Sequence, residues 1–172
     1  MQGSQIFCNG TGYILDHLNK YDEALKAYDK AIEINPPDSV SWYNKGVVLD
    51  ELGKYDEAIK AYDKAIKINP PDSVSWYNKG VNLQILNRHE EAITALNKSI
   101  GLDPKYPYGW LNKGFSLVEL KKPNEAIRAF DNAIELDPQN AYAWDGKGFA
   151  LNRLGKYDEA IRAFDKVTYF SL

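Results

Sequence analysis

Side-chain amides recur at a fixed interval in this sequence. Asn44, Asn78 and Asn112 are separated by 34 residues each time, and Tyr43 and Tyr77 directly precede the first two. A side-chain amide can donate to and accept from a peptide main chain, and an aromatic ring can take up an apolar side chain. The chemistry that these residues could perform is therefore recognition of a polypeptide.

Residues that could perform catalysis or bind a metal are few. His17 and His89 are the only histidines, and neither is spaced from Cys, Asp or Glu as metal ligands are. Cys8 is the single cysteine, and the residue 34 positions downstream is a tryptophan, so it is predicted to pack as a buried side chain and not to act as a nucleophile. No glycine-rich phosphate loop is present. We therefore expect no enzymatic activity, no cofactor and no metal site.

The composition limits the class of partner. The chain has 172 residues, of which 44% are hydrophobic, enough for a sizeable core. Its 21 basic and 24 acidic side chains are interleaved, without the basic block that would neutralise nucleic-acid phosphates. No segment approaches the roughly 18 apolar residues of a membrane span, and the N-terminal segment lacks the basic leader of a signal peptide. We expect a cytoplasmic protein that binds neither nucleic acid nor membrane.

The 34-residue interval extends to several residue types. A tryptophan is followed by a glycine four residues later and by an alanine sixteen residues later, and a fixed period of this length is typical of a solenoid. The repeated positions are Trp42, Trp76, Trp110 and Trp144; Gly46, Gly80, Gly114 and Gly148; Ala58, Ala92, Ala126 and Ala160; and Pro36, Pro70, Pro104 and Pro138. We predict one solenoid domain, 1–172, of about five copies: 5–38 (degenerate), 39–72, 73–106, 107–140 and 141–172, the last incomplete and without a capping helix.

Each copy is predicted to form two helices. In the second copy these span 39–52 and 55–68, a proline pair ends the second helix, and Asp72 is suited to cap the next one. The second helix has one apolar stripe, which we expect to be buried, and a charged opposite face. The stripe consists of Tyr55, Ala58, Ile59, Tyr62, Ala65 and Ile66.

The first helix of each copy differs, because it carries two uncharged stripes on roughly opposite sides. One contains a tryptophan and a glycine and is suited to close packing between helices. The other contains the asparagine and is the best candidate for a binding surface. In the second copy the packing stripe is Trp42, Gly46 and Leu49, and the other stripe is Val40, Tyr43, Asn44 and Val47.

The repeated Trp, Gly, Ala and Pro pattern resembles the tetratricopeptide repeat family. The resemblance implies an all-α fold, a right-handed superhelical solenoid of antiparallel helix pairs, in which the first helices line an inner groove. It also implies an adaptor that binds peptides or partner proteins in that groove without catalysing a reaction. The residues expected to line the groove are Val40, Tyr43, Asn44, Val47, Val74, Tyr77, Asn78, Val81, Tyr108, Leu111, Asn112, Phe115, Tyr142 and Phe149.

The asparagines allow two interpretations. They resemble the asparagine ladder with which some members of the family hold a peptide main chain, or they bond to neighbouring helices as part of the scaffold. The tyrosines beside them can likewise contact a ligand or pack between repeats. The central rows have no basic residue beside the asparagine, which argues against the carboxylate clamp of the co-chaperone members. The recurring lysines, such as Lys45, lie about 100° or more around the helix and are predicted to be solvated or packed along their stems.

Two functions remain open at this point. The first is a protein-interaction module that binds a peptide segment or partner protein in the groove. The alternative is a structural scaffold that self-assembles through uncapped solenoid ends. The sequence is also compatible with a fragment of a longer array.

Overall fold

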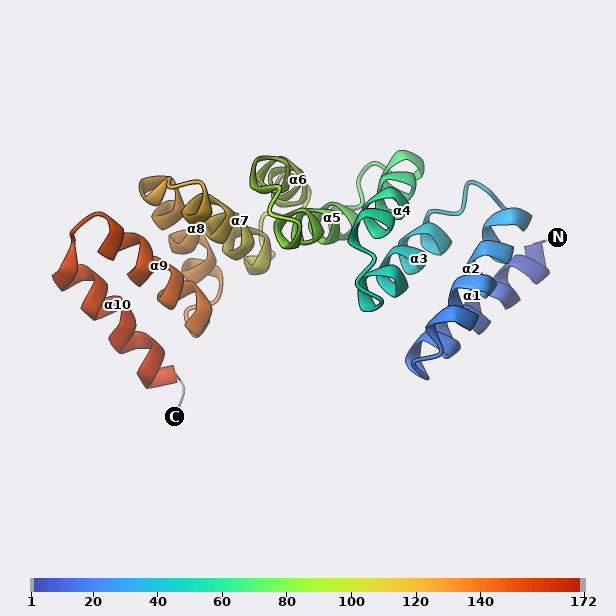
Figure 1. Cartoon of the computed structure of the whole chain (residues 1–172), viewed down its shortest axis with the longest axis horizontal. Helices are drawn as coiled ribbons and strands as arrows, with labels where there is room; N and C mark the ends of the chain where they lie inside the picture. The colour runs from blue at the N-terminus through green and yellow to red at the C-terminus, as the bar shows by residue number, and fades with distance from the viewer. Residues whose placement is uncertain (1, 171–172) are drawn as a thin grey trace. The chain divides into compact units, whose positions relative to one another are not determined.

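The computed structural model describes residues 2–170, and the side chains of residues 3–167. Every element in this range is an α-helix, and helices that follow one another within one half of the chain, such as α1 and α2 or α7 and α8, form antiparallel hairpins (Figure 1). The predicted all-α fold of paired helices is confirmed. The helices are α1 (Gln2–His17), α2 (Tyr21–Ile34), α3 (Ser39–Glu51), α4 (Tyr55–Ile68), α5 (Ser73–Ile85), α6 (His89–Leu102), α7 (Pro107–Glu119), α8 (Pro123–Leu136), α9 (Ala141–Arg153) and α10 (Tyr157–Phe170).

The helices group into two compact units. The first, residues 1–86, contains α1 to α5, and the second, residues 87–172, contains α6 to α10. Within each unit every helix packs against the next one along the chain. A single solenoid domain of five copies stays a prediction.

The turns between repeats are held by side chains that repeat with them. The Asp72 carboxylate accepts the backbone N–H groups of Val74 and Ser75, both at 3.1 Å, and caps α5 as expected. The Trp42 indole Nε1 donates to the carbonyl of Pro36 at 3.2 Å. Trp110 and Trp144 make the same bond to the proline six residues upstream. The tryptophan therefore ties the start of each of these helices to the preceding turn, a role that its apolar character alone does not indicate.

The predicted buried stripe of the second helix is confirmed in α4 except at Tyr55, which is half-buried. Ala58, Tyr62 and Ala65 are fully buried, and Ile59 and Ile66 are less than a tenth exposed. In α3, however, the buried positions include Ser41 and Val48, which lie outside both predicted stripes. Val48 packs with residues of α2, in the preceding repeat. The first helix therefore has a third packing face, which contacts the helix pair before it.

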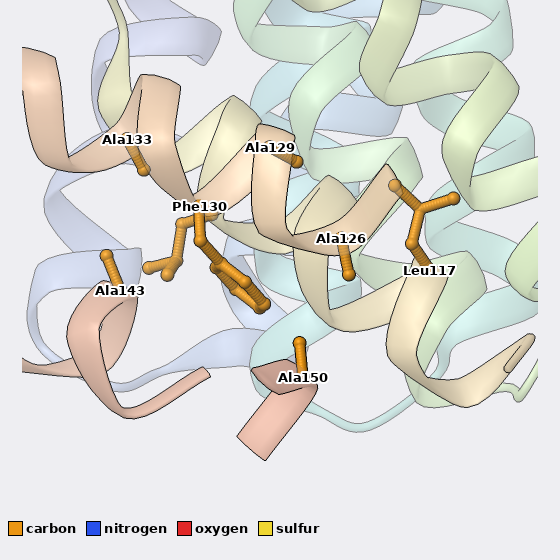
Figure 2. Close-up of a cluster of buried hydrophobic side chains, with 8 residues drawn as sticks. Leu117, Ala126, Ala129, Phe130, Ala133, Ala143 and Ala150 are labelled. Atoms are coloured by element: carbon orange, nitrogen blue, oxygen red, sulfur yellow. The ribbon is translucent and has the colours of Figure 1, made fainter. Parts of the chain in front are cut away.

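Phe130 fills the centre of the second unit. Figure 2 shows its ring among small side chains of α8 and α9, including Ala126, Ala143 and Ala150. A Cβ added to Gly114 would lie 2.5 Å from one ring atom, and a Cβ added to Gly146 would lie 2.5 Å from another. Glycines of α7 and α9 therefore leave the space that the ring occupies. The repeated glycine was predicted to let a neighbouring helix come close. At Gly114 the group that comes close is the aromatic ring of Phe130, from the second helix of the same copy.

The last helix completes its pair. α10 runs from Tyr157 to Phe170. It has the 14 residues of every other second helix. The side chains of residues 168–170, and residues 171 and 172 altogether, on which the expected absence of a cap depends, lie outside the described residues.

Candidate functional site

The candidate surface of the first unit follows one side of α3 and α5. We call it the α3–α5 surface, and its members differ in exposure. Val40 and Val74 are 54% and 50% exposed, while the tyrosines and asparagines are half-buried. The α3–α5 surface consists of Val40, Tyr43, Asn44, Val47, Val74, Tyr77, Asn78 and Val81.

A hollow opens within this surface. It has a volume of about 270 Å³ and is lined by Val40 and Tyr43 from α3 and by Val74 from α5. Polar groups of Ser39, Asn69 and Asp72 complete its lining. Apolar walls with a few polar groups at one side suit an apolar side chain whose main chain stays hydrogen-bonded.

Two of the three asparagines bond to neighbouring helices. The Asn44 amide nitrogen donates to the Asn9 amide oxygen, on α1, at 3.3 Å. Asn78 hydrogen-bonds to the hydroxyl of Tyr62, on α4. Tyr43 packs against the buried cluster that contains Tyr62, with ring centroids 6.0 Å apart. Asn44 and Asn78 therefore bond to neighbouring helices, as the scaffold interpretation expects. If they also bind a ligand, they must do so through amide atoms that these hydrogen bonds do not use.

A buried polar network connects this surface to the core. The Tyr62 hydroxyl donates to Asp50 Oδ2 at 2.5 Å, and the Asn82 amide donates to Asp50 Oδ1. Tyr62 and Asn82 are almost fully buried, at 0% and 2% exposure. Burial raises the pKa of Asp50, against the hydrogen bonds from Tyr62 and Asn82, which lower it. Burial and the neighbouring Asp50 also raise the pKa of Tyr62. The network joins α3, α4 and α5 through three side chains.

The sequence did not single out this network. Asp50 corresponds to Asp16, Gln84, Val118 and Asn152 in the other copies, so the aspartate recurs only in the first copy and the position has no residue type common to all five. Asn82 likewise stands where the second copy has Val48. A polar residue at a position that is apolar in a sister copy is the one signal that could have drawn attention to it.

The candidate residues of the second unit lie on α7 and α9. Tyr142, Phe149 and Tyr108 are exposed at 71%, 54% and 44%. Asn112 donates to the carbonyl of Tyr108 in its own helix at 3.0 Å, and Phe115 is half-buried with its ring edge toward Phe130, 5.3 Å between centroids. We call Tyr108, Asn112, Phe115, Tyr142 and Phe149 the α7–α9 surface.

Leu111 needs a correction. It was expected to line the groove, but it is only 5% exposed and belongs to the core cluster around Phe130. Its counterparts Tyr43 and Tyr77 are half-buried, because a tyrosine can pack its ring and still present a polar tip to water. Leucine has no such tip, so it gains most by full burial.

The repeated lysines are held by two contacts. Lys45, Lys79 and Lys147 each place Nζ 5.4–5.6 Å from the ring centroid of the tryptophan three residues earlier. Each also forms a salt bridge with an aspartate of the preceding helix, at 2.5, 2.5 and 2.6 Å. Of the two predicted states, solvated or packed along the stem, these lysines adopt the packed one. The sequence did not predict the salt bridges. The partners are Asp29, Asp63 and Asp131.

The two histidines and the cysteine have separate local surroundings. His17 places its Nδ1 3.0 Å from the carbonyl of Tyr13, and His89 begins α6 at a position where other copies have tyrosine. Cys8 is half-buried. No three His, Cys, Asp or Glu side chains of the described residues gather into a possible metal site. Nor does any helix among these residues combine the length and apolar character that crossing a membrane requires.

Solved structures with the same fold cover nearly the whole chain. A crystal structure of MamA protein matches with a TM-score of 0.94 and 22% identity, over 99% of this chain and 93% of that one. MamA 41-end from Desulfovibrio magneticus RS-1 matches with a TM-score of 0.92 and 21% identity, over 98% and 95%. YrrB, described as a TPR protein with an unusual peptide-binding site, matches with a TM-score of 0.85 and 23% identity, over 95% and 84%. At these identities the likeness shows the fold. A comparison with curated protein sequences finds no match.

Family models place the repeats directly on the sequence. Models of the tetratricopeptide repeat match residues 7–38 and 39–72, residues 74–106, and residues 111–169. The matched segments follow the helix pairs α1–α2, α3–α4 and α5–α6, and then the helices from α7 to α10. The chain therefore belongs to the tetratricopeptide repeat family.

Proposed function

We propose that this chain, a protein-interaction module of tetratricopeptide repeats, binds an extended peptide segment on its α3–α5 surface. The observation that carries the proposal is the hollow of about 270 Å³ between Val40, Tyr43 and Val74. Its apolar walls accept one side chain of the peptide. Repeats of this family generally act without catalysis, and YrrB, which has the same fold, is described as having a peptide-binding site.

The polar groups around the hollow support an extended ligand. The Asn44 amide uses one donor in its bond to Asn9, so its oxygen and its second N–H remain for a peptide main chain. The Asp72 carboxylate caps α5, so we assign it a structural role in the wall of the hollow and not a contact with the peptide. An extended segment presents alternate side chains to one side, which suits a surface with one hollow and exposed apolar side chains around it.

The test replaces the two exposed valines of the hollow. Val40→Glu with Val74→Glu is expected to weaken binding of a peptide selected from a displayed library by tenfold or more, from an initial Kd of about 1 μM. Both side chains are about half exposed, so the fold should persist. Fluorescence anisotropy with the labelled peptide measures the change.

A matched control comes from the last helix. Tyr157 and Ile161, on α10 in the other unit, are 64% and 59% exposed, and Tyr157→Glu with Ile161→Glu introduces two carboxylates of the same kind. It should leave the Kd unchanged. If library selection yields no binder, or if selected peptides bind the valine variant as tightly as the wild type, the α3–α5 surface is not the site.

A second candidate function, self-association, is favoured by the outer face of α1. Phe7, Ile6 and Ile14 are exposed at 74%, 63% and 61%. A hollow of about 640 Å³ lies beside them, lined in part by Phe7, Cys8 and Ile34. Phe7 stands at a repeat position where the inner copies carry Ser41, Ser75, Gly109 and Ala143, all buried. An apolar face of this kind can be covered by a second copy of the chain.

Light scattering across a concentration series tests self-association. The weight-average mass of the wild type is expected to grow with concentration, and Phe7→Ser, which restores the residue type of the inner copies, should shift that growth to higher concentration. Tyr142→Ser, at a 71% exposed position of α9, serves as the exposed control. A strictly monomeric wild type would exclude this function.

A further inference from the structure

One lysine of the repeated series lacks the partner that its sisters have. Lys45, Lys79 and Lys147 each pair with an aspartate sixteen residues earlier in the chain, at 2.5 to 2.6 Å. In the fourth copy the lysine is Lys113, and the residue sixteen positions earlier is Asn97. The salt bridge therefore cannot form there, since asparagine carries no charge.

The environment of Lys113 is otherwise that of its sisters. Its Nζ lies 5.2 Å from the Trp110 ring centroid, compared with 5.4 to 5.6 Å in the other copies. Lys113 is half-buried and forms no salt bridge with any described residue. Burial lowers the pKa of its ammonium, and the Glu125 carboxylate only partly opposes this. The chain thus holds a partly desolvated cation in a place built for an ion pair.

The surroundings leave room for a ligand. A hollow of about 280 Å³ lies beside Lys113, between α7 and α8, and Trp110 and Leu117 form part of its wall. Arg128 supplies a second cation and Glu125 a single carboxylate. A similar hollow lies beside Lys147, with Arg162 and Glu159, so the missing aspartate is what distinguishes Lys113. Asn97, on α6 and outside the lining of the hollow, has an amide that can donate a hydrogen bond at the repeat position where the sister copies have a carboxylate.

We propose that Lys113, with Arg128 in the same hollow and Asn97 at the repeat position of the missing aspartate, binds a carboxylate of an acidic side chain on a partner protein. The three corresponding lysines indicate the ligand, because each binds an aspartate carboxylate while it lies over the tryptophan of its own copy. The partner's carboxylate replaces the missing internal aspartate. Lys113 is adjacent to Asn112, about 100° around the helix, so this site is separate from the α7–α9 surface.

The test follows Lys113 by NMR while small carboxylates are added. N-acetylaspartate N-methylamide, which presents a side-chain carboxylate in a peptide setting, should shift the Lys113 Cε and Trp110 indole resonances saturably, with a Kd of about 10 mM. Acetate should bind more weakly, because it lacks the flanking peptide groups. Equal or tighter binding of acetate would contradict the assignment to a partner's side chain.

Two variants of this site and one matched control sharpen the test. Asn97→Asp supplies the internal partner, so it should abolish the shifts and raise the Lys113 pKa measured from the same Cε resonance. Lys113→Met keeps the stem and should also abolish the Trp110 shift. Lys147→Met changes a lysine that already has its aspartate, and should leave the Lys113 titration unchanged.

The proposal fails if the probe does not bind to the wild type, if Asn97→Asp and Lys113→Met bind the probe as the wild type does, or if Asn97→Asp leaves the Lys113 pKa where it was. The pKa comparison needs no ligand, so it tests separately whether a carboxylate at position 97 reaches Lys113, while the probe titration tests binding. All these residues belong to the second unit, whereas the proposed peptide site lies on α3 and α5. Either can therefore fail without the other.

Discussion

Replacing Phe130 with alanine is expected to lower the free energy of unfolding of the second unit by about 3–5 kcal/mol. The ring is fully buried, and it is enclosed by Gly114 on α7 and Gly146 on α9. Neither glycine has a side chain that could move into the space, so the cavity left by Phe130→Ala would stay largely open. Urea unfolding followed by far-ultraviolet circular dichroism measures the loss.

A coupled substitution tests the reason for this loss. In the wild type, Gly146→Ala forces a methyl group to within 2.5 Å of the Phe130 ring and should destabilise by about 1–3 kcal/mol. In the Phe130→Ala background the same methyl group enters empty space, so its effect should be neutral or stabilising. Tyr142→Ala, at a 71% exposed position, is the control and should change stability by less than about 0.5 kcal/mol. Additive effects of the two core substitutions would contradict the proposed packing.

Features that repeat could be predicted from the sequence. The burial of Ala58, Tyr62 and Ala65 follows from helical spacing within a single segment, and the 14-residue span of α4 matches its expected bounds. The cap at Asp72 follows from local hydrogen-bonding chemistry. In each case the evidence lies within a few turns of one helix, so the pattern is sufficient.

Contacts between copies could not be predicted in the same way. Asp50 and Asn82 are 32 residues apart, and no other copy has an asparagine at the position of Asn82, so the 34-residue period does not point to their contact. Ser41 is polar in composition yet fully buried, because its hydroxyl donates to Asp38 at 2.5 Å. At the candidate site the same limit placed Leu111 on the surface, since its row was deduced from Tyr43 and Tyr77. Whether such a residue is buried depends on how its side chain fits against the neighbouring copy, and the sequence of one helix does not show that fit.

Replacing Asp50 with alanine is expected to lower the free energy of unfolding of the first unit by about 2–4 kcal/mol, since two buried groups lose their acceptor. The Tyr62 hydroxyl and the Asn82 amide both donate to this carboxylate, and neither side chain is more than 2% exposed. Asp50→Asn is the matched control: it keeps an acceptor for Tyr62, so most of the stability should remain. Urea unfolding of the three proteins at pH 7 makes the comparison, and equal stability of the alanine and asparagine variants would contradict the network.

The pH dependence of the same proteins tests the charge of Asp50. Burial raises its pKa in the folded chain above the usual value of about 3.9, so folding favours the protonated carboxyl. This contribution to stability is complete below the unfolded pKa and is lost as the pH rises through the folded pKa. The unfolding free energy of the wild type relative to Asp50→Asn should therefore fall as the pH rises from about 4, and level off once the carboxyl is ionised in both states. A relative stability that rises with pH would instead mean that the hydrogen bonds from Tyr62 and Asn82 outweigh the cost of burial, and that the network holds a carboxylate stabilised in its charged form.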